Sequence, residues 1–328
     1  MFETAQKLGH VPIIENELVQ EELQNFETRE TDPEEAPIGG YSVSVDDLPD
    51  EGSDPDYLLS IDGSPREVPI NDDYPSNRIG FIQIAAVLTN LQLIDAQQTK
   101  RFVDPAQVQE IDKSSLQDIV LPSSNYTVAG CATTLDSWRK TVLQTFQNRE
   151  IEDKSLLEVF LDVIESNERY VDDHTVDVYR CPNPDCETTG SKPHIHVNAY
   201  QGGQCDTCGV DVCPTDALRT HERVNQNQPN QTAITAIMNV LEHLTMCAYL
   251  LYLHRTSPER LSRVGFVMDG PLAIFDTPAW FHEPILETID QIYTEQWEMG
   301  YSPPLIVGIE KSGSFRDHAD NIEDEMES

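Results

Sequence analysis

Three carboxylates stand in segments that otherwise read as buried, a pattern that supports metal-dependent chemistry. Asp62 ends the apolar run YLLSID, Asp269 ends VGFVMD, and each is followed directly by a glycine. Glu242 lies inside a nearly apolar stretch at residues 232–254. If the fold brings the three side chains together, their oxygens form a pocket suited to Mg²⁺ or Mn²⁺. Two such ions can activate a water and stabilise the leaving oxygen of a phosphodiester.

Each carboxylate also has a purely structural explanation. Asp-Gly pairs are common in turns, because Asp bonds to nearby backbone and Gly accepts unusual dihedral angles. Glu242 could instead pair with a core Arg or His, since a lone ionised Glu in an apolar helix is costly unless a partner or cation compensates it. Three clustered carboxylates would repel one another without metal, so such a site should be partly protonated until a cation binds.

Four cysteines in two pairs form the clearest metal-binding motif. Cys181 and Cys186 frame CPNPDC, Cys205 and Cys208 frame CDTC, and eighteen residues separate the pairs. Two such knuckles joined by a hairpin can place four thiolates tetrahedrally around Zn²⁺, as in zinc ribbons. Disulfides and a redox CxxC are the alternatives, although disulfides suit exported proteins and a redox pair does not need the first two cysteines. A closed four-cysteine site stabilises a module and leaves no position open for catalysis.

The remaining cysteines and two histidines have simpler explanations. Cys213, His194 and His196 are near the motif, so any of them could replace a ligand, although polar surface positions are the simpler interpretation. Cys131 and Cys247 lie in apolar runs and are expected to be small core residues.

The net charge of the chain limits the kind of environment and the kinds of partner that suit it. It carries 58 Asp plus Glu against 21 Lys plus Arg over 328 residues, a formal charge of -37. Acid spread over a whole surface resembles proteins from salt-loving organisms. Such a surface repels nucleic acid unless salt or a bound metal screens it. The start of the chain has no signal-peptide pattern, so the cytoplasm is the expected location.

One segment is long enough to span a membrane. Residues 232–254 have the required length, but Asn239, Glu242 and His243 near the middle favour a buried core helix instead. No membrane association is therefore expected.

The elements that must position these groups follow from apolar spacing and turn signals. We predict an acidic, largely disordered region at 1–56 with an amphipathic helix near 12–28, and a core whose two parts, 57–180 and 226–328, flank a zinc ribbon at 181–225. The core should hold a mixed sheet flanked by helices, in an α/β fold. Predicted strands lie near 57–68, 78–94, 125–133, 263–272 and 303–312, and the first two are antiparallel with Ile82, Ile84 and Ala86 on one face. Predicted helices follow Asp136 and Ser155 and occupy 232–254 and 278–298.

Four short motifs, in this order, resemble the NurA nuclease family. They are SIDGS at 60–64, NVLEHL at 239–244, VMDGPL at 267–272 and VGIEKSG at 307–313. The similarity covers roughly residues 57–95 and 230–320, with the ribbon as an insertion between them. It implies a ribonuclease H-like core and Mn²⁺-preferring 5' to 3' exonuclease and single-strand endonuclease activity in DNA end resection during double-strand break repair.

The resemblance also implies partners and residue roles. The partners are DNA, the hexameric HerA helicase-translocase and a second copy in a dimeric toroid. Asp62, Glu242 and Asp269 would be the metal ligands, and Lys311 either contacts phosphate or is a surface ion-pair lysine. Family members continue past the EKSG strand with further elements and a late histidine, whereas this chain stops at HADNIEDEMES. That role is not carried onto His318.

A catalytically silent, C-terminally truncated adapter that binds DNA or protein through its ribbon is therefore the second hypothesis. A PD-(D/E)xK nuclease is more distant, because Glu310 and Lys311 are adjacent.

Overall fold

The structure of the chain is a computed structural model. The structure describes residues 55–70, 74–98, 112–165, 167, 170–172, 175–187 and 195–311. The helix expected near 12–28 lies outside the described residues, as do His194 and His318.

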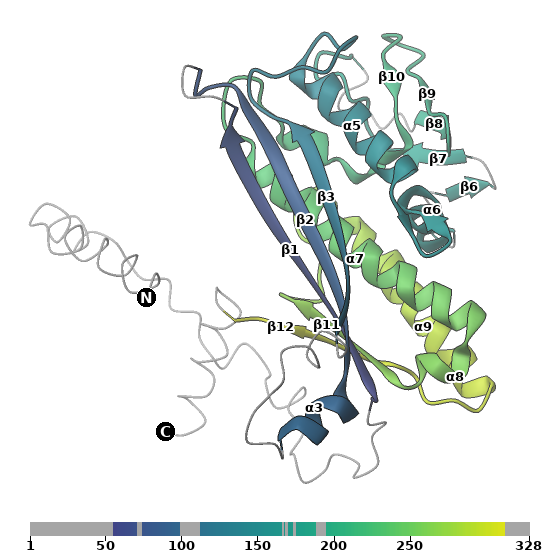
Figure 1. The fold of residues 1–328 in the computed structure, drawn as a ribbon. Coiled ribbons are helices and arrows are strands. Elements are labelled where there is room, and N and C mark those ends of the chain that lie inside the picture. The colour runs from purple at the N-terminus through teal and green to yellow at the C-terminus, as the bar shows by residue number, and fades with distance from the viewer. Residues whose placement is uncertain are drawn as a thin grey trace, which may run out of the picture. The chain divides into compact units, whose positions relative to one another are not determined.

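The centre of the fold is a five-stranded mixed sheet (Figure 1). Its strands β1, β2 and β3 form an antiparallel meander, and β11 and β12 add to the free side of β1 in parallel. The predicted antiparallel pairing of the first two strands is therefore confirmed. The order across the sheet is β12 (Leu305–Ile309), β11 (Val264–Asp269), β1 (Tyr57–Pro69), β2 (Arg78–Asn90) and β3 (Asp112–Pro122).

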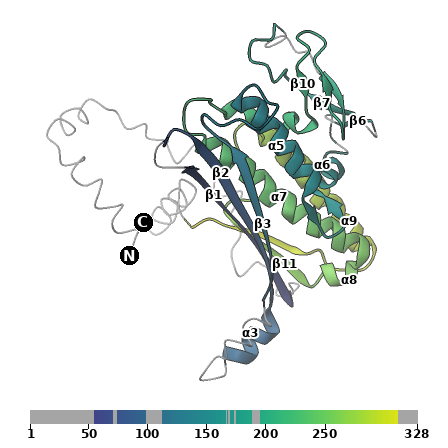
Figure 2. The same ribbon diagram turned by 45° about the horizontal axis from the view of Figure 1, so that its top comes forward.

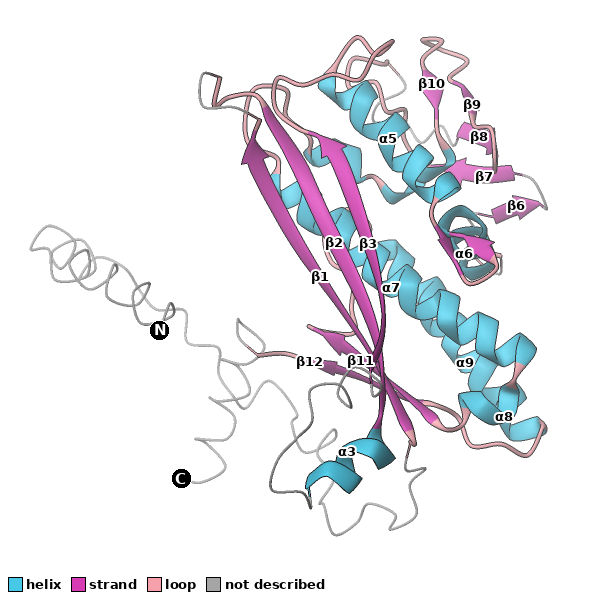
Figure 3. Cartoon of the chain, in the orientation of Figure 1, coloured by secondary structure: helices cyan, strands magenta, loops and turns pink. Residues whose placement is uncertain are grey.

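One face of this sheet holds the core. Ile82, Ile84 and Ala86 alternate along β2 and are at most 3% exposed, as the two-residue period of a strand predicts. The long helix α7 (Gln231–Thr256) packs across β1 and β2 on this face (Figure 3). On the opposite face Leu116 and Val120 of β3 are 59% and 54% exposed. The sheet is thus covered by helices on one side and accessible on the other.

Local sequence signals explain where the surrounding helices begin. The Thr133 side chain accepts a hydrogen bond from the Asp136 amide and caps α5 (Thr134–Asn148). Ser155 and Glu158 form a reciprocal capping box at α6 (Leu156–Ile164). Both predicted helices are confirmed. The remaining helices are α3 (Leu91–Gln98), α8 (Pro258–Leu261) and α9 (His282–Glu298), which a short 3₁₀ turn at Ala279–Phe281 precedes (Figure 2).

Helix α7 is long and apolar enough to cross a membrane by length and composition, but 72% of its most apolar window is buried inside the protein. Cys247 on this helix is fully buried, as expected. The interpretation of residues 232–254 as a core helix agrees with this placement.

A small β-rich module interrupts the two halves of the core. Its three-stranded sheet has the order β6-β7-β8, and β9 and β10 form a short hairpin beside β8. Two 3₁₀ turns then lead back to α7. The bounds of the module's elements are β6 (Tyr170–Asp172), β7 (Thr175–Val178), β8 (Ile195–Asn198), β9 (Gly203–Gln204), β10 (Asp211–Val212) and the turns Pro214–Leu218 and Thr220–Arg223. A separate short pair, β4 (Glu150–Ile151) and β5 (Lys154–Ser155), lies between α5 and α6.

Three predictions differ from the structure. Residues 125–133 form turns and bends rather than a strand, and Cys131 there is half-buried rather than in the core. The second strand ends at Asn90, whose side chain accepts the Leu93 amide, and the apolar residues that follow begin α3. A polar side chain that satisfies a helix's first free amides outweighs the strand-like composition of the run.

Candidate functional site

Asp62 and Asp269 lie beside each other on neighbouring strands. Ile61 of β1 is in register with Met268 of β11 in a parallel pair, so the next residue of each strand is an aspartate. Both strands are about 4.8 Å apart in such a ladder. Ile61 and Met268 are buried against the helices, whereas both aspartates are exposed. The alternation of strand side chains therefore directs the two carboxylates to the accessible side of the sheet.

Glu242 reaches the same region from the helical side. Its side chain lies on α7, is 6% exposed, and accepts a hydrogen bond from the backbone N–H of Gly63, the residue after Asp62. A Cβ atom at Gly63 would stand 2.7 Å from Glu242 Oε1 and 2.8 Å from Met238 Cγ. The missing side chain is thus what lets the helix carboxylate contact the β1 backbone.

The electrostatics of Glu242 connect all three carboxylates. The pKa of Glu242 is raised to about 8, mainly by burial and to a smaller extent by the charges of Asp62 and Asp269, against the opposing effect of the Gly63 hydrogen bond. Without a cation, Glu242 is therefore mostly protonated at neutral pH. The structure brings the three carboxylates predicted from sequence into one electrostatic neighbourhood.

Lys311 joins this group through an ion pair. Its Nζ donates to Asp269 Oδ2 at 2.9 Å, and this bond raises the pKa of the lysine. The side chain is 69% exposed. The geometry agrees with the ion-pair explanation of Lys311, and the same ammonium also interacts electrostatically with Asp62.

A buried carboxylate at the start of α7 helps to set the position of Glu242. Glu67 on β1 has a side chain only 3% exposed and accepts the backbone N–H of Asn230, the residue that precedes α7, at 2.9 Å. It also accepts from the Ser123 hydroxyl and lies 3.6 Å from the Arg78 guanidinium. A carboxylate at a helix N-terminus is favoured by the helix dipole. Strand β1 therefore holds both Asp62 and the anchor of the helix that carries Glu242.

The four cysteines form a second, tighter cluster. Sulfurs of Cys181, Cys186, Cys205 and Cys208 all lie within 4.8 Å of one another. The closest contacts are 3.6 Å for Cys181–Cys208 and 4.0 Å for Cys186–Cys205, well beyond a disulfide bond of about 2.0 Å. In the described part of the chain, no other group brings three His, Cys, Asp or Glu ligand atoms so close together. The three core carboxylates are therefore more open than this cluster.

The cysteine cluster has the chemistry of a closed metal site. The Val210 amide lowers the pKa of Cys208 to about 6, which favours its thiolate, whereas burial raises the pKa of the neighbouring Cys181 in the absence of a metal. Gly209 has φ +71°, the left-handed conformation needed for the knuckle after CDTC. Cys213 is buried but outside the cluster, and His196 is an exposed β8 residue 3.7 Å from Asp177. Neither residue replaces a ligand.

Comparisons with known proteins add no relative. No family model, curated protein or solved structure matches this chain. The site is therefore described by its own residues.

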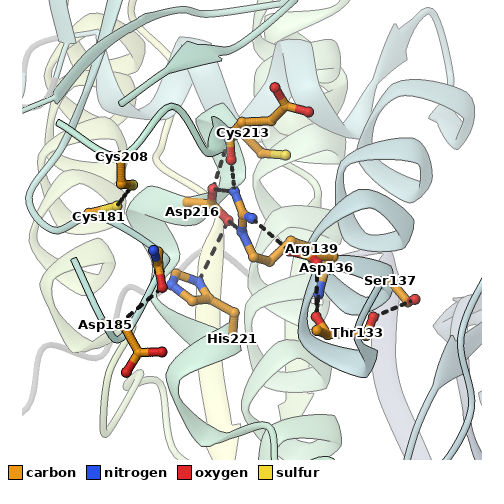
Figure 4. A network of polar contacts seen from close by, with 12 residues as sticks. Thr133, Asp136, Ser137, Arg139, Cys181, Asp185, Cys208, Cys213, Asp216 and His221 are labelled. Carbon is orange, nitrogen blue, oxygen red and sulfur yellow. Dashed lines mark hydrogen bonds and ion pairs between the residues drawn. The ribbon is translucent and has the colours of Figure 1, made fainter. Parts of the chain in front are cut away.

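A buried ion pair that the sequence did not indicate ties the cysteine module to the core (Figure 4). Arg139 of α5 is 4% exposed and donates from Nε to Asp216 at 2.9 Å. Asp216 is 2% exposed, accepts the Cys213 amide at 2.8 Å, and lies 3.6 Å from His221 Nδ1. Arg139 and Asp216 are 77 residues apart. No local pattern signals such a pair, because each residue alone looks like an ordinary surface charge.

Proposed function

We propose that this chain is a metal-dependent DNA nuclease of the NurA type, with a ribonuclease H-like core and a zinc ribbon inserted between its halves. The observation that supports this most directly is the electrostatic influence of Asp62 and Asp269, which end neighbouring strands, on the buried Glu242. These residues belong to three separate motifs of the resemblance, and Glu242 has a pKa near 8 because of burial and the two aspartates. In this proposal Asp62, Glu242 and Asp269 hold Mn²⁺ or Mg²⁺.

The donor set fits hard divalent cations, which prefer carboxylate oxygens. When bound, such ions supply a nucleophilic water and stabilise the leaving oxygen of a phosphodiester. The chain itself contributes two exposed aspartates at the accessible side of the sheet and a glutamate that loses its proton when a cation arrives. Lys311, held beside Asp269, supplies a positive charge within reach of a phosphate.

The proposal assigns the remaining partners by the same resemblance. DNA, a HerA-type hexameric translocase and a second copy of the chain are the expected partners, and the four cysteines hold Zn²⁺. A surface of formal charge -37 disfavours DNA at low ionic strength. Cation-filled carboxylates and salt reduce this repulsion.

The test is cleavage of a labelled DNA strand by the full chain in the presence of Mn²⁺. Changing Asp62→Ala or Asp269→Ala should abolish degradation while leaving the circular dichroism spectrum unchanged, because both side chains are exposed. Asp118→Ala is the matched control, since the side chain of this exposed β3 aspartate accepts a hydrogen bond from Gln83 and lies outside the carboxylate group. Equal cleavage by the parent and both site variants would refute the proposal.

A second candidate function is a catalytically silent adapter that binds DNA or protein through its ribbon. The compactness of the cysteine cluster, compared with the more open carboxylates, favours it. In that case the protein contains zinc, and the same assay leaves the DNA strand uncut at any Mn²⁺ concentration.

A further inference from the structure

A cavity of about 640 Å³ lies apart from both sites, between the sheet and the C-terminal half of α7. Its walls come from the beginning of β1, the end of β2, the C-terminal half of α7, the short helix α8 and the beginning of β11. Neither the three core carboxylates nor the four cysteines line it. Its volume is in the range of ordinary small-molecule sites.

The interior of this cavity is apolar and aromatic. Leu59 and Val264 form buried parts of the wall, at 5% and 7% exposure. Tyr249 and Tyr252, on successive positions of the α7 surface, contribute two rings, and the Tyr249 hydroxyl is already bonded to Ser115 at 3.2 Å. Tyrosine rings favour flat partners that stack on or against them.

The charged residues that line the cavity are Arg260, Arg263 and one carboxylate, Glu152. Arg263 pairs with Asp56, but Arg260 makes no ion pair with any carboxylate in the part of the chain that the structure describes. In a chain with 58 acidic and 21 basic residues, most cations should find a carboxylate. An unpaired guanidinium beside an apolar cavity is a suitable partner for an anionic group, because it can bond to two oxygens in one plane.

We propose that this cavity binds a small organic anion with a flat apolar body, whose carboxylate or phosphate contacts Arg260 while its ring system lies against Tyr249 and Tyr252. The proposal is independent of the nuclease assignment. An aromatic carboxylate and a nucleoside monophosphate share this chemistry and differ in the anionic group. A base or aromatic ring gains affinity by stacking on a tyrosine, so the ring supplies a large part of the binding.

The test uses the full, zinc-loaded chain and two probes, 2-naphthoate and deoxyadenosine monophosphate, in saturation-transfer NMR titrations. Saturable binding of either probe supports the proposal and identifies the anionic group that fits. Arg260→Gln should weaken that probe by about three- to ten-fold, since an exposed charge contributes less than a buried one. Binding of the uncharged 2-naphthamide should not respond to this substitution.

Two further variants separate the cavity from unspecific attraction to arginine. Leu88→Trp fills the cavity and should abolish binding of both probes. Tyr252→Ala removes one of the two rings and should weaken binding of both probes. It provides the test if Leu88→Trp does not fold. Arg255→Gln is the matched control, because this exposed arginine pairs with Asp153 and does not line the cavity. Failure of both probes to bind, or equal binding by the parent, Arg260→Gln and Tyr252→Ala chains, would overturn the proposal.

Discussion

The cysteine cluster and the carboxylate group are built in opposite ways. The cysteines come from two short knuckles close in sequence, and three of the four are buried with their sulfurs already within 4.8 Å of one another. The carboxylates come from two strands and a helix at distant points of the chain, and only Glu242 is buried. The first arrangement resembles a closed structural site. The second stays accessible and stores electrostatic repulsion that a bound cation would relieve.

Removing metal from the cysteines should have the largest effect if this contrast is correct. Structural zinc contributes roughly 10–16 kcal/mol of apparent binding free energy in small zinc domains at pH 7. We expect one zinc per chain by elemental analysis, and we expect a strong chelator or Cys205→Ser to expose residues 181–213 to proteolysis. Cys213→Ala is the control and should retain the metal, because Cys213 lies outside the cluster. If residues 181–213 resist proteolysis equally well without zinc, the cysteine cluster is not a structural metal site.

Cutting the connection between the module and the core should have the next largest effect. Arg139→Leu leaves Asp216 buried without its cation, and loss of one partner of a buried pair costs about 3–5 kcal/mol. The free energy of unfolding from urea titration should fall by that amount. The double variant Arg139→Leu/Asp216→Leu should recover much of the loss, since no buried charge is left unpaired. A single variant as stable as the parent would show that the two regions are held together by other contacts.

The carboxylate group should show a pH dependence of its own, which Glu242 dominates. The pKa of Glu242 is raised from 4.5 to about 8, so the folded state favours its protonated form. This stabilisation is fully present below about pH 4.5 and is lost as the pH rises toward 8. At about 1.4 kcal/mol per pKa unit, the loss is on the order of a few kcal/mol.

Urea titrations of the parent and of Glu242→Gln between pH 5 and 8 measure this effect. The titrations contain no Mn²⁺ or Mg²⁺, and zinc stays on the cysteines. Glu242→Gln should flatten the pH slope of stability, and added Mn²⁺ should do the same in the parent. If the free energy of unfolding of the parent and of Glu242→Gln depends on pH with the same slope, the buried Glu242 is not the source of the pH dependence. The two groups would then differ only in how closely their side chains are packed.

Much of the secondary structure followed from local signals. The alternation of Ile82, Ile84 and Ala86 and the capping residue Ser155 act within a few positions, and the structure confirms what they predict. The mistakes arose where a tertiary partner or a cap outweighed composition, as at Asn90 and residues 125–133. Strand β3 was not identified, because most residues of DKSSLQDIVLP are polar and its buried apolar side chains, Ile119 and Leu121, come near its end.

The sequence by itself determined the grouping of the four cysteines as a possible metal site, because each knuckle is set by a few neighbouring dihedral angles. Only the tertiary structure decided that Asp62 and Asp269 lie on adjacent parallel strands with Glu242 beside Gly63. It likewise decided that Arg139 pairs with Asp216 and that a cavity lies next to Arg260. Contacts between distant segments depend on strand register and helix packing, which are properties of the whole chain and leave no mark at the individual residues.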